Sequence, residues 1–183
     1  MAPTSASAPL RLFFALWPDD TVRAALAALT VELHERCGGR AMAATNLHAT
    51  LAFLGNVPHE RVADFVAMAD ALRAEPFDLP LDTLNYWRRN RIVWAGARNV
   101  PAALAALADE MKCGVQGLGW PVDERPYAAH VTLLRDARRG PPAHEVRLPL
   151  WRVTDFVLVA STQQSGGVVY EPLRRWTLRA QPV

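Results

Sequence analysis

The chain has 183 residues, 51% of them hydrophobic, and a formal net charge of +2 at pH 7. This composition favours a globular protein with a real hydrophobic core. No apolar run approaches membrane-spanning length, and residues 1–9 lack the basic start and apolar centre of a signal peptide, which argues against membrane and secreted classes and predicts a cytoplasmic protein.

Strands and helices alternate in the predicted first half. Residues 10–17 form an apolar run typical of a buried strand. Pro18 with Asp19 and Asp20 supplies a helix start, and this helix is expected to end near residue 37, before two glycines. A second strand is expected at about 47–54. Pro58 then starts an amphipathic helix with its apolar face running as far as Leu72.

The second half continues this theme and then consists mainly of strands. Extended segments near 77–87 and 91–97 precede a helix at about 101–116, and a loop leads into a strand at 129–134. The last strands are expected near 147–152, 154–162 and 168–178, with a hairpin turn at Ser165-Gly166-Gly167. The sequence therefore predicts an α+β fold of mostly antiparallel sheet, with three helices on its outer faces and a single domain over residues 1–183.

One short motif occurs twice. His48-Ala49-Thr50-Leu51 and His130-Val131-Thr132-Leu133 both match H-x-T-L, and their histidines are 130 − 48 = 82 residues apart. Each copy begins a predicted strand, in which residues i and i+2 point to one face about 6.5 Å apart, so each imidazole lies beside a hydroxyl. A single histidine in an apolar strand is more often structural, but the shared leucine and the matching contexts favour function.

Two histidines suit phosphodiester chemistry that needs no metal. One imidazole can remove a proton from the attacking oxygen while the other gives a proton to the leaving oxygen, since the ordinary pKa of histidine lies near neutral pH. We therefore expect a bilobal, pseudo-symmetric arrangement in which both His/Thr pairs face a central cleft.

Basic residues are almost all arginine, because Lys112 is the only lysine among 20 basic residues. Two arginine clusters, at 88–91 and 135–139, could line a groove for a polyanion, although most arginines are expected on a solvated surface. The lysine is followed by Cys113-Gly114-Val115 and so lacks the K-x-D-G pattern of nucleotidyl-transfer ligases. A G-x-x-x-x-G-K phosphate loop is also absent, which argues against a nucleoside triphosphate site.

Neither the histidines nor the cysteines have the spacing of a metal site, so we expect no metal and no cofactor. Cys37 and Cys113 are 113 − 37 = 76 residues apart and are expected to be free thiols in a reducing compartment. The remaining histidines are expected on the surface: His34, His59 and His144.

Five segments carry a resemblance to a known family: 11–16 (RLFFAL), 46–55 (NLHATLAFLG), 91–94 (RIVW), 130–137 (HVTLLRDA) and 170–176 (YEPLRRW). With both H-x-T motifs and the trailing arginine, the chain resembles the 2H phosphoesterases, and within them the bacterial RNA 2′,3′-cyclic phosphodiesterase family, also called the 2′-5′ RNA ligase family. The resemblance covers nearly the whole chain, and no motif position departs from the pattern.

The resemblance implies hydrolysis of a 2′,3′-cyclic phosphate at an RNA end to a 2′-phosphomonoester, without a metal. By this likeness His48 donates a proton to the departing 3′ oxygen, and His130 is the base that activates water. Ligation, if it occurs, would be an ATP-independent reversal of transesterification at the same two histidines.

The resemblance also implies contacts to the substrate, whose partners are RNA ends or oligonucleotides with a cyclic phosphate. Thr50 and Thr132 would hold phosphate oxygens, Arg135 would lie near phosphate or base, and Phe14 would form a base-stacking wall. A monomer is expected, because no coiled-coil seam is present. A non-catalytic module that binds RNA ends in the same cleft stays open as an alternative at this point.

Overall fold

The structure is a computed structural model that describes residues 8–141, 146–165 and 167–179. Its helices are α1 (Asp20–Cys37), α2 (His59–Ala71) and α3 (Ala102–Gly117), with a short 3-10 helix η1 (Ala44–Asn46). Its strands are β1 (Leu10–Leu16), β2 (Arg40–Ala41), β3 (Ala49–Val57), β4 (Phe77–Leu79), β5 (Thr83–Trp87), β6 (Ile92–Gly96), β7 (His130–Arg135), β8 (Trp151–Val153), β9 (Asp155–Gln164) and β10 (Gly167–Thr177).

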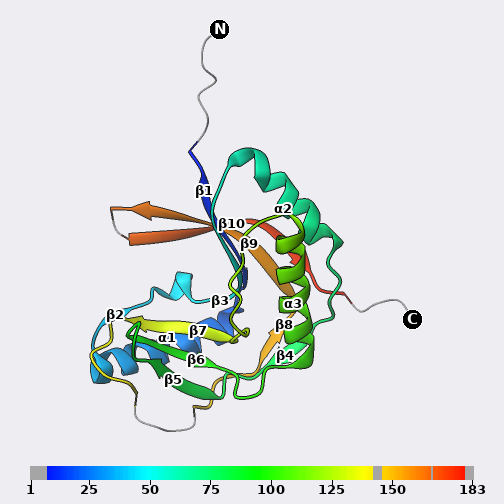
Figure 1. Ribbon diagram of the computed structural model, residues 1–183. Helices are drawn as coiled ribbons and strands as arrows, with labels where there is room; N and C mark the ends of the chain where they lie inside the picture. Colours follow the sequence, from blue (N-terminus) through cyan, green and yellow to red (C-terminus); the bar gives the residue numbers. More distant parts are fainter. Residues whose placement is uncertain (1–7, 142–145, 166, 180–183) are drawn as a thin grey trace.

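Most strands belong to one large sheet (Figure 1). Its order is β10-β9-β1-β3-β7-β6-β5, with β2 paired to β7 off this path, while β4 and β8 form a separate two-stranded sheet. Every pairing between the described strands is antiparallel. The expected α+β class with mostly antiparallel strands is confirmed.

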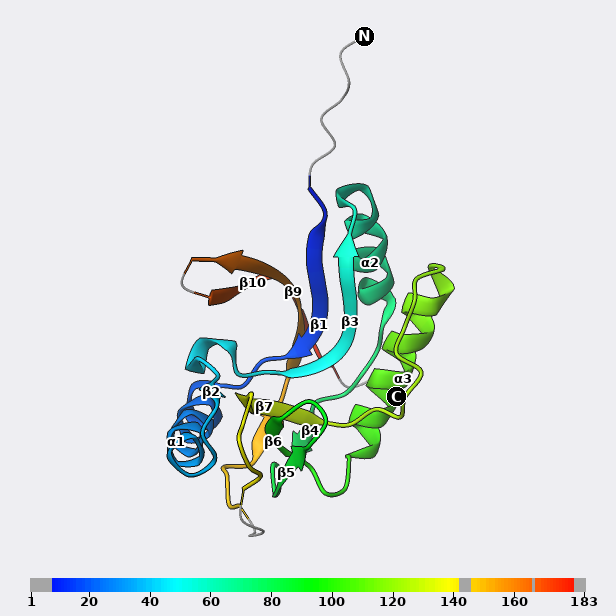
Figure 2. The same ribbon diagram turned by 60° about the vertical axis from the view of Figure 1, so that its left-hand side comes forward.

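The large sheet has two halves that meet at a narrow point. β1 and β3 stay paired from Leu10–Val57 to Leu16–Ala49, whereas β3 and β7 share the single pair Ala49–Val131. Beyond that pair β2 takes the place of β3 along β7, with Arg40 opposite Arg135. The motif strands β3 and β7 are therefore the junction between a β10-β9-β1-β3 lobe and a β7-β6-β5 lobe (Figure 2).

Helices cover the two halves in different places. α1 packs on β7 and β2, whereas α2 packs on α3 and α3 packs on β3. In both ribbon views α2 and α3 lie together on one side of the molecule, away from α1 (Figures 1 and 2).

α1 begins where the Asp19 carboxylate accepts a hydrogen bond from the Val22 N–H at 2.9 Å, which caps the first turn as the sequence indicates. None of the described helices is long and apolar enough to cross a bilayer.

Prolines shorten two of the expected strands. The extended segment near 77–87 is divided into β4 and β5 around Pro80, and the strand expected at 147–152 is reduced to β8, which begins two residues after Pro149. Proline has no N–H to donate to a strand ladder, so it favours the ends of strands over their interiors. Gly166 of the expected hairpin turn and His144 lie outside the described residues; His34 and His59 are exposed, as expected.

β1 separates two apolar clusters. Leu12, Phe14 and Leu16 are fully buried in the main core, together with the inner faces of the helices. Phe13 and Ala15, which alternate with them, pack on β9 at the opposite face in a smaller cluster flanked by Trp17 and Tyr170. This second face is the one that reaches the functional site described below.

Candidate functional site

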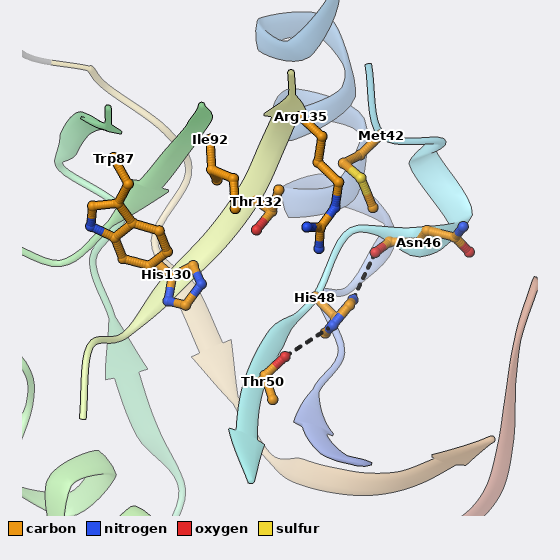
Figure 3. Close-up of a pocket in the computed structure, with 9 residues that line it drawn as sticks. All are labelled: Met42, Asn46, His48, Thr50, Trp87, Ile92, His130, Thr132 and Arg135. Atoms are coloured by element: carbon orange, nitrogen blue, oxygen red, sulfur yellow. Dashed lines mark hydrogen bonds between the residues drawn. The ribbon is translucent and has the colours of Figure 1, made fainter. Parts of the chain in front are cut away.

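A cavity of about 120 Å³ lies at the junction of the two lobes (Figure 3). It is lined by Met42, Asn46, His48, Thr50, Trp87, Ile92, His130, Thr132 and Arg135. Pockets for whole small molecules usually measure about 300–1,000 Å³, so this cavity suits a group the size of a phosphate. The sugar and base of a nucleotide would have to lie outside it.

The single Ala49–Val131 pair explains how the two motifs meet. Side chains two residues apart in a strand share a face, and so do side chains directly opposite each other in neighbouring strands. Ala49 and Val131 are fully buried on one face, so the histidine and threonine on either side of each point to the other. Both His/Thr pairs line the same cavity.

His48 is anchored through both ring nitrogens. Its Nδ1 lies 2.7 Å from the Asn46 carbonyl oxygen, which can only accept, so Nδ1 carries the proton. In the neutral ring Nε2 is then an acceptor, and it lies 3.1 Å from the Thr50 hydroxyl, which donates to it (Figure 3). The ring stacks on Trp17 at 5.5 Å between centroids and 9° between planes.

His130 has the same backbone anchor but different neighbours. Its Nδ1 donates to the Ala128 carbonyl oxygen at 2.7 Å, again two residues back along the chain, so Nε2 is free to face the cavity. Trp87 and Trp94 present their rings to it at centroid distances of 4.6 and 5.9 Å. Gly96 lies directly opposite His130 on β6, so no side chain occupies that place.

Burial keeps both imidazoles neutral at neutral pH. It lowers the pKa of His48 from 6.5 to about 4, mainly because water is excluded from the ring; the Asn46 hydrogen bond opposes the shift, and the positive charges of His130 and Arg135 add to it. Burial also lowers the pKa of His130, with the Ala128 hydrogen bond opposing and Arg135 adding. An anion in the cavity would reverse much of this effect, because it stabilises the charged imidazolium.

Arg135 reaches the cavity because β7 contains an irregularity. Val93 of β6 pairs with Leu134, but the next residue, Trp94, pairs with Thr132, so Leu133 is an extra residue on β7. Leu133 and Leu134 are both fully buried, and the two-residue alternation shifts by one. A bulge of this kind redirects the following side chain, so Arg135 joins the face of His130 and Thr132.

Known proteins resemble this chain over nearly its whole length. Residues 16–94 match the family model described as LigT-like phosphoesterase. The RNA 2′,3′-cyclic phosphodiesterase of Escherichia coli K12 is 37% identical over 94% of this chain and 98% of its own length. This chain belongs to the LigT-like phosphoesterase family. A further relative, the RNA 2′,3′-cyclic phosphodiesterase of Thermus thermophilus, is 31% identical over 94% of this chain and 92% of its own length.

A solved structure of the family has the same fold. The crystal structure of E. coli LigT complexed with 3′-AMP has a TM-score of 0.88 and 36% sequence identity, and covers 94% of this chain and 99% of that chain. The match includes both lobes, so membership of the LigT-like phosphoesterase family rests on the whole architecture as well as on the repeated motif.

One of the six expected site residues is wrongly assigned. Phe14 is fully buried in the main core, where its ring lies against Phe156 and Trp176, and it has no surface to offer a base. The neighbouring Phe13 faces the other side of β1, with its ring centroid 4.9 Å from that of His48. The alternation of strand faces, applied from the buried Leu12, would have indicated this.

Several residues of the site were not singled out from the sequence. Asn46 holds His48 through its carbonyl oxygen and ties the η1 segment to β10, since its side-chain amide donates to the Val168 carbonyl at 2.8 Å. Tyr170 of β10 meets the His48 ring edge-on at 5.1 Å. Trp87 precedes one arginine cluster, but nothing local marks it as a neighbour of His130. The one sequence signal for these contacts is the position two residues before each histidine, Asn46 and Ala128, whose carbonyl oxygens both accept the Nδ1 proton.

The described residues contain no group of three or more histidine, cysteine, aspartate or glutamate side chains that could hold a metal ion. Cys37 and Cys113 are both free, as expected, the first buried and the second exposed. The polar groups that line the cavity include two imidazoles, two hydroxyls and a guanidinium, a set suited to an anion and to proton transfer.

Proposed function

We propose that this protein hydrolyses RNA 2′,3′-cyclic phosphate ends to 2′-phosphomonoesters by a two-histidine acid/base mechanism that needs no metal. The observation that carries the proposal is the convergence of both His/Thr pairs on one phosphate-sized cavity. Supporting it, the E. coli and T. thermophilus relatives bear the name RNA 2′,3′-cyclic phosphodiesterase, and E. coli LigT has been crystallised with 3′-AMP.

In the proposed reaction, His130 accepts a proton from water at Nε2 as the water oxygen bonds to phosphorus. The bond from phosphorus to the 3′ oxygen breaks, and His48 gives its Nε2 proton to that oxygen. The product is a 2′-phosphomonoester with a free 3′ hydroxyl. One imidazole has gained a proton and the other has lost one, so exchange with solvent restores the starting state before the next turnover.

Thr50, Thr132 and Arg135 stabilise the phosphoryl oxygens in this scheme. The hydroxyls donate hydrogen bonds from opposite lobes, and the guanidinium supplies a fixed positive charge. Thr50 donates a hydrogen bond to His48 Nε2 in the structure. A bound anion promotes protonation of His48, and the protonated Nε2 no longer accepts this hydrogen bond. The hydroxyl can then donate to a phosphate oxygen, so substrate binding and protonation of the acid occur together.

The same site would support ligation without ATP. A 5′ hydroxyl that takes the place of water would attack the cyclic phosphate with His130 as base, and departure of the 3′ oxygen would leave a 2′-5′ linkage. Because the bond energy comes from the strained cyclic phosphate, no nucleotide cofactor is needed.

The decisive experiment offers the protein an oligonucleotide that ends in a 2′,3′-cyclic phosphate, in buffer containing EDTA, and identifies the product isomer. We expect the 2′-phosphomonoester. A 3′-phosphomonoester would contradict the assignment of the leaving oxygen, and loss of activity that a divalent ion restores would contradict the metal-free mechanism.

The leaving group separates the two histidine roles. A nitrophenyl phosphodiester releases a weakly basic oxygen that needs no proton. Because His48 is the proposed acid, we expect His48→Ala to retain a much larger share of wild-type activity on this substrate than on the cyclic phosphate. His130→Ala should lose activity on both, and the opposite pattern would exchange the two roles.

We also propose that residues 1–183 act as one monomeric unit in the cytoplasm. Two free cysteines suit a reducing compartment. Light scattering of the purified chain tests the monomer, and a mass of two or more chains would contradict it.

A further inference from the structure

We propose that Arg40 holds the next phosphate of the RNA chain, one nucleotide upstream of the cyclic phosphate that reacts. The proposal rests on the function proposed above and gives that site a preference for RNA chains over free cyclic nucleotides. Arg40 lies outside the cavity lining and is exposed at the start of β2.

The first observation is a pair of like charges in register. Arg40 lies directly opposite Arg135 in the antiparallel β2–β7 pair. Side chains in such positions have Cβ atoms about 4.5–5.5 Å apart, and like charges there are destabilising. Among the described residues neither guanidinium makes an ion pair, in contrast to Arg36 with Glu32 and Arg91 with Asp136. The arrangement lacks its own counter-charge.

The second observation is that Arg40 faces the cavity side of the sheet. Its partner Arg135 and its neighbour Met42, two residues further along the chain, both line the cavity. Arg135 is placed on the reacting phosphate. Arg40 then provides a second positive charge at the mouth, where the part of a nucleotide that does not fit in the cavity must lie.

The third observation is that the turn before β2 fixes the backbone position of Arg40 beside the end of β7. Gly38 and Gly39 have φ values of +66° and +88°, a turn that L side chains rarely adopt. A Cβ on Gly39 would come within 2.6 Å of the Arg135 carbonyl oxygen, so the turn sits directly on the end of β7. The Arg138 N–H also donates to the Cys37 carbonyl at 2.9 Å. The backbone positions of Arg40 and Arg135 are therefore held side by side by the fold.

Two neighbouring arginines match the charges at the end of a polynucleotide. A nucleoside 2′,3′-cyclic phosphate carries one phosphate, which the cavity accepts. An RNA chain adds a second negative charge on the 5′ side of the same nucleotide, and a planar guanidinium binds phosphate oxygens in pairs. The cost of holding two arginines side by side is then offset when RNA is bound.

Three substrates test the proposal: a nucleoside 2′,3′-cyclic phosphate, a dinucleotide with the same cyclic end, and that dinucleotide with an uncharged methylphosphonate linkage. We expect Arg40→Gln to lower kcat/KM about tenfold for the charged dinucleotide alone. The dependence of log(kcat/KM) on log salt should become shallower by about 0.7 for that substrate. The control is Arg152→Gln, which removes an exposed strand arginine that pairs with Asp78 in the separate sheet. It should change neither kcat/KM nor its salt dependence.

A structural role for Arg40 predicts different results. If the side chain only stabilises the fold, Arg40→Gln lowers the unfolding temperature and all three rates together; we expect an unchanged or higher unfolding temperature, since a like-charge pair is relieved. An equal loss on all three substrates, or no loss on the charged dinucleotide, overturns the proposal.

A binding measurement keeps this test separate from the proposed function. The affinities of wild type and Arg40→Gln are compared for a dinucleotide that ends in a 2′-phosphate and for its methylphosphonate form. If wild type turns over none of the three substrates, the proposed function fails, while a tenfold affinity loss confined to the charged dinucleotide would still support the Arg40 site.

Discussion

The two copies of the H-x-T motif share one anchor and differ in their surroundings. Each histidine donates its Nδ1 proton to the carbonyl oxygen two residues back, at 2.7 Å in both cases. His48 then stacks on Trp17 and accepts from Thr50, whereas His130 lies opposite a glycine and beside Trp87 and Trp94. Backbone symmetry places the imidazoles, and the neighbouring strands make them chemically unequal.

The largest expected effect comes from removing either imidazole. A positioned general acid or base contributes about 10²-fold to 10⁴-fold, so His48→Ala and His130→Ala should each lower kcat/KM for the cyclic phosphate by that factor. His59→Ala, an exposed histidine at the start of α2, is the matched control and should change nothing. If one site variant kept full activity, the two-histidine mechanism would fail.

The hydroxyls should show the next largest effect, and an unequal one. Thr50→Val and Thr132→Val each remove a proposed donor to the phosphoryl oxygens, with an expected loss of about 10²-fold in kcat. Of these two threonines, only Thr50 has a hydrogen bond to an imidazole among the described residues, so Thr50→Val should also change the pKa of His48, measured by NMR. The same pKa of His48 in Thr50→Val and in Thr132→Val would contradict this difference.

The pH optimum reports both imidazoles together. The proposed active form carries one proton on the pair, so kcat/KM rises and then falls as the two are titrated. The pKa of each histidine in the free protein lies below 6.5, that of His48 at about 4. We therefore expect a bell whose maximum lies below pH 6.5, and a maximum above pH 7 would contradict the assignment.

Removing the stacked indole should make the two histidines more alike. Trp17→Leu opens His48 to water, so its pKa should rise towards 6.5 in an NMR titration while that of His130 changes little. The loss of packing should cost about 1–2 kcal/mol of unfolding free energy. Trp87→Leu is the matched variant beside the other histidine and should raise the pKa of His130 instead.

The last expected effect is on stability in acid and not on turnover. The unfolded chain binds a proton at each histidine near pH 6.5, whereas folded His48 does so only near pH 4. Between these values the unfolded state holds more protons, so the unfolding free energy falls as pH falls, by up to about 1.4 kcal/mol per pH unit for this group. Urea titrations of wild type and His48→Gln should show a shallower pH dependence in the variant.

Sequence patterns were sufficient for the parts of this fold that depend on local chemistry. The strand–helix order, the helix start at Asp19 and the side-by-side placement of imidazole and hydroxyl follow from alternation, capping and spacing. The repeated motif also indicated that two lobes would meet. These features require no knowledge of which strands become neighbours.

The features that the sequence did not reveal depend on register between distant strands. Strict alternation from His130 would turn Arg135 to the other face, and only the bulge at Leu133 brings it to the cavity. The family resemblance implies base stacking by Phe14, although the side chain on the site's face of β1 is Phe13. The tryptophans around the histidines come from β5, β6 and the end of β1, whose pairing partners no local pattern specifies.

The most direct test of convergence on one phosphate is an NMR titration of the wild-type protein with a nucleoside 2′-phosphate, following the ring signals of both catalytic histidines. We predict that the signals of His48 and His130 shift together along one binding curve with one Kd, and that both pKa values rise. A response from one ring alone, or two curves with different dissociation constants, would contradict a shared phosphate site.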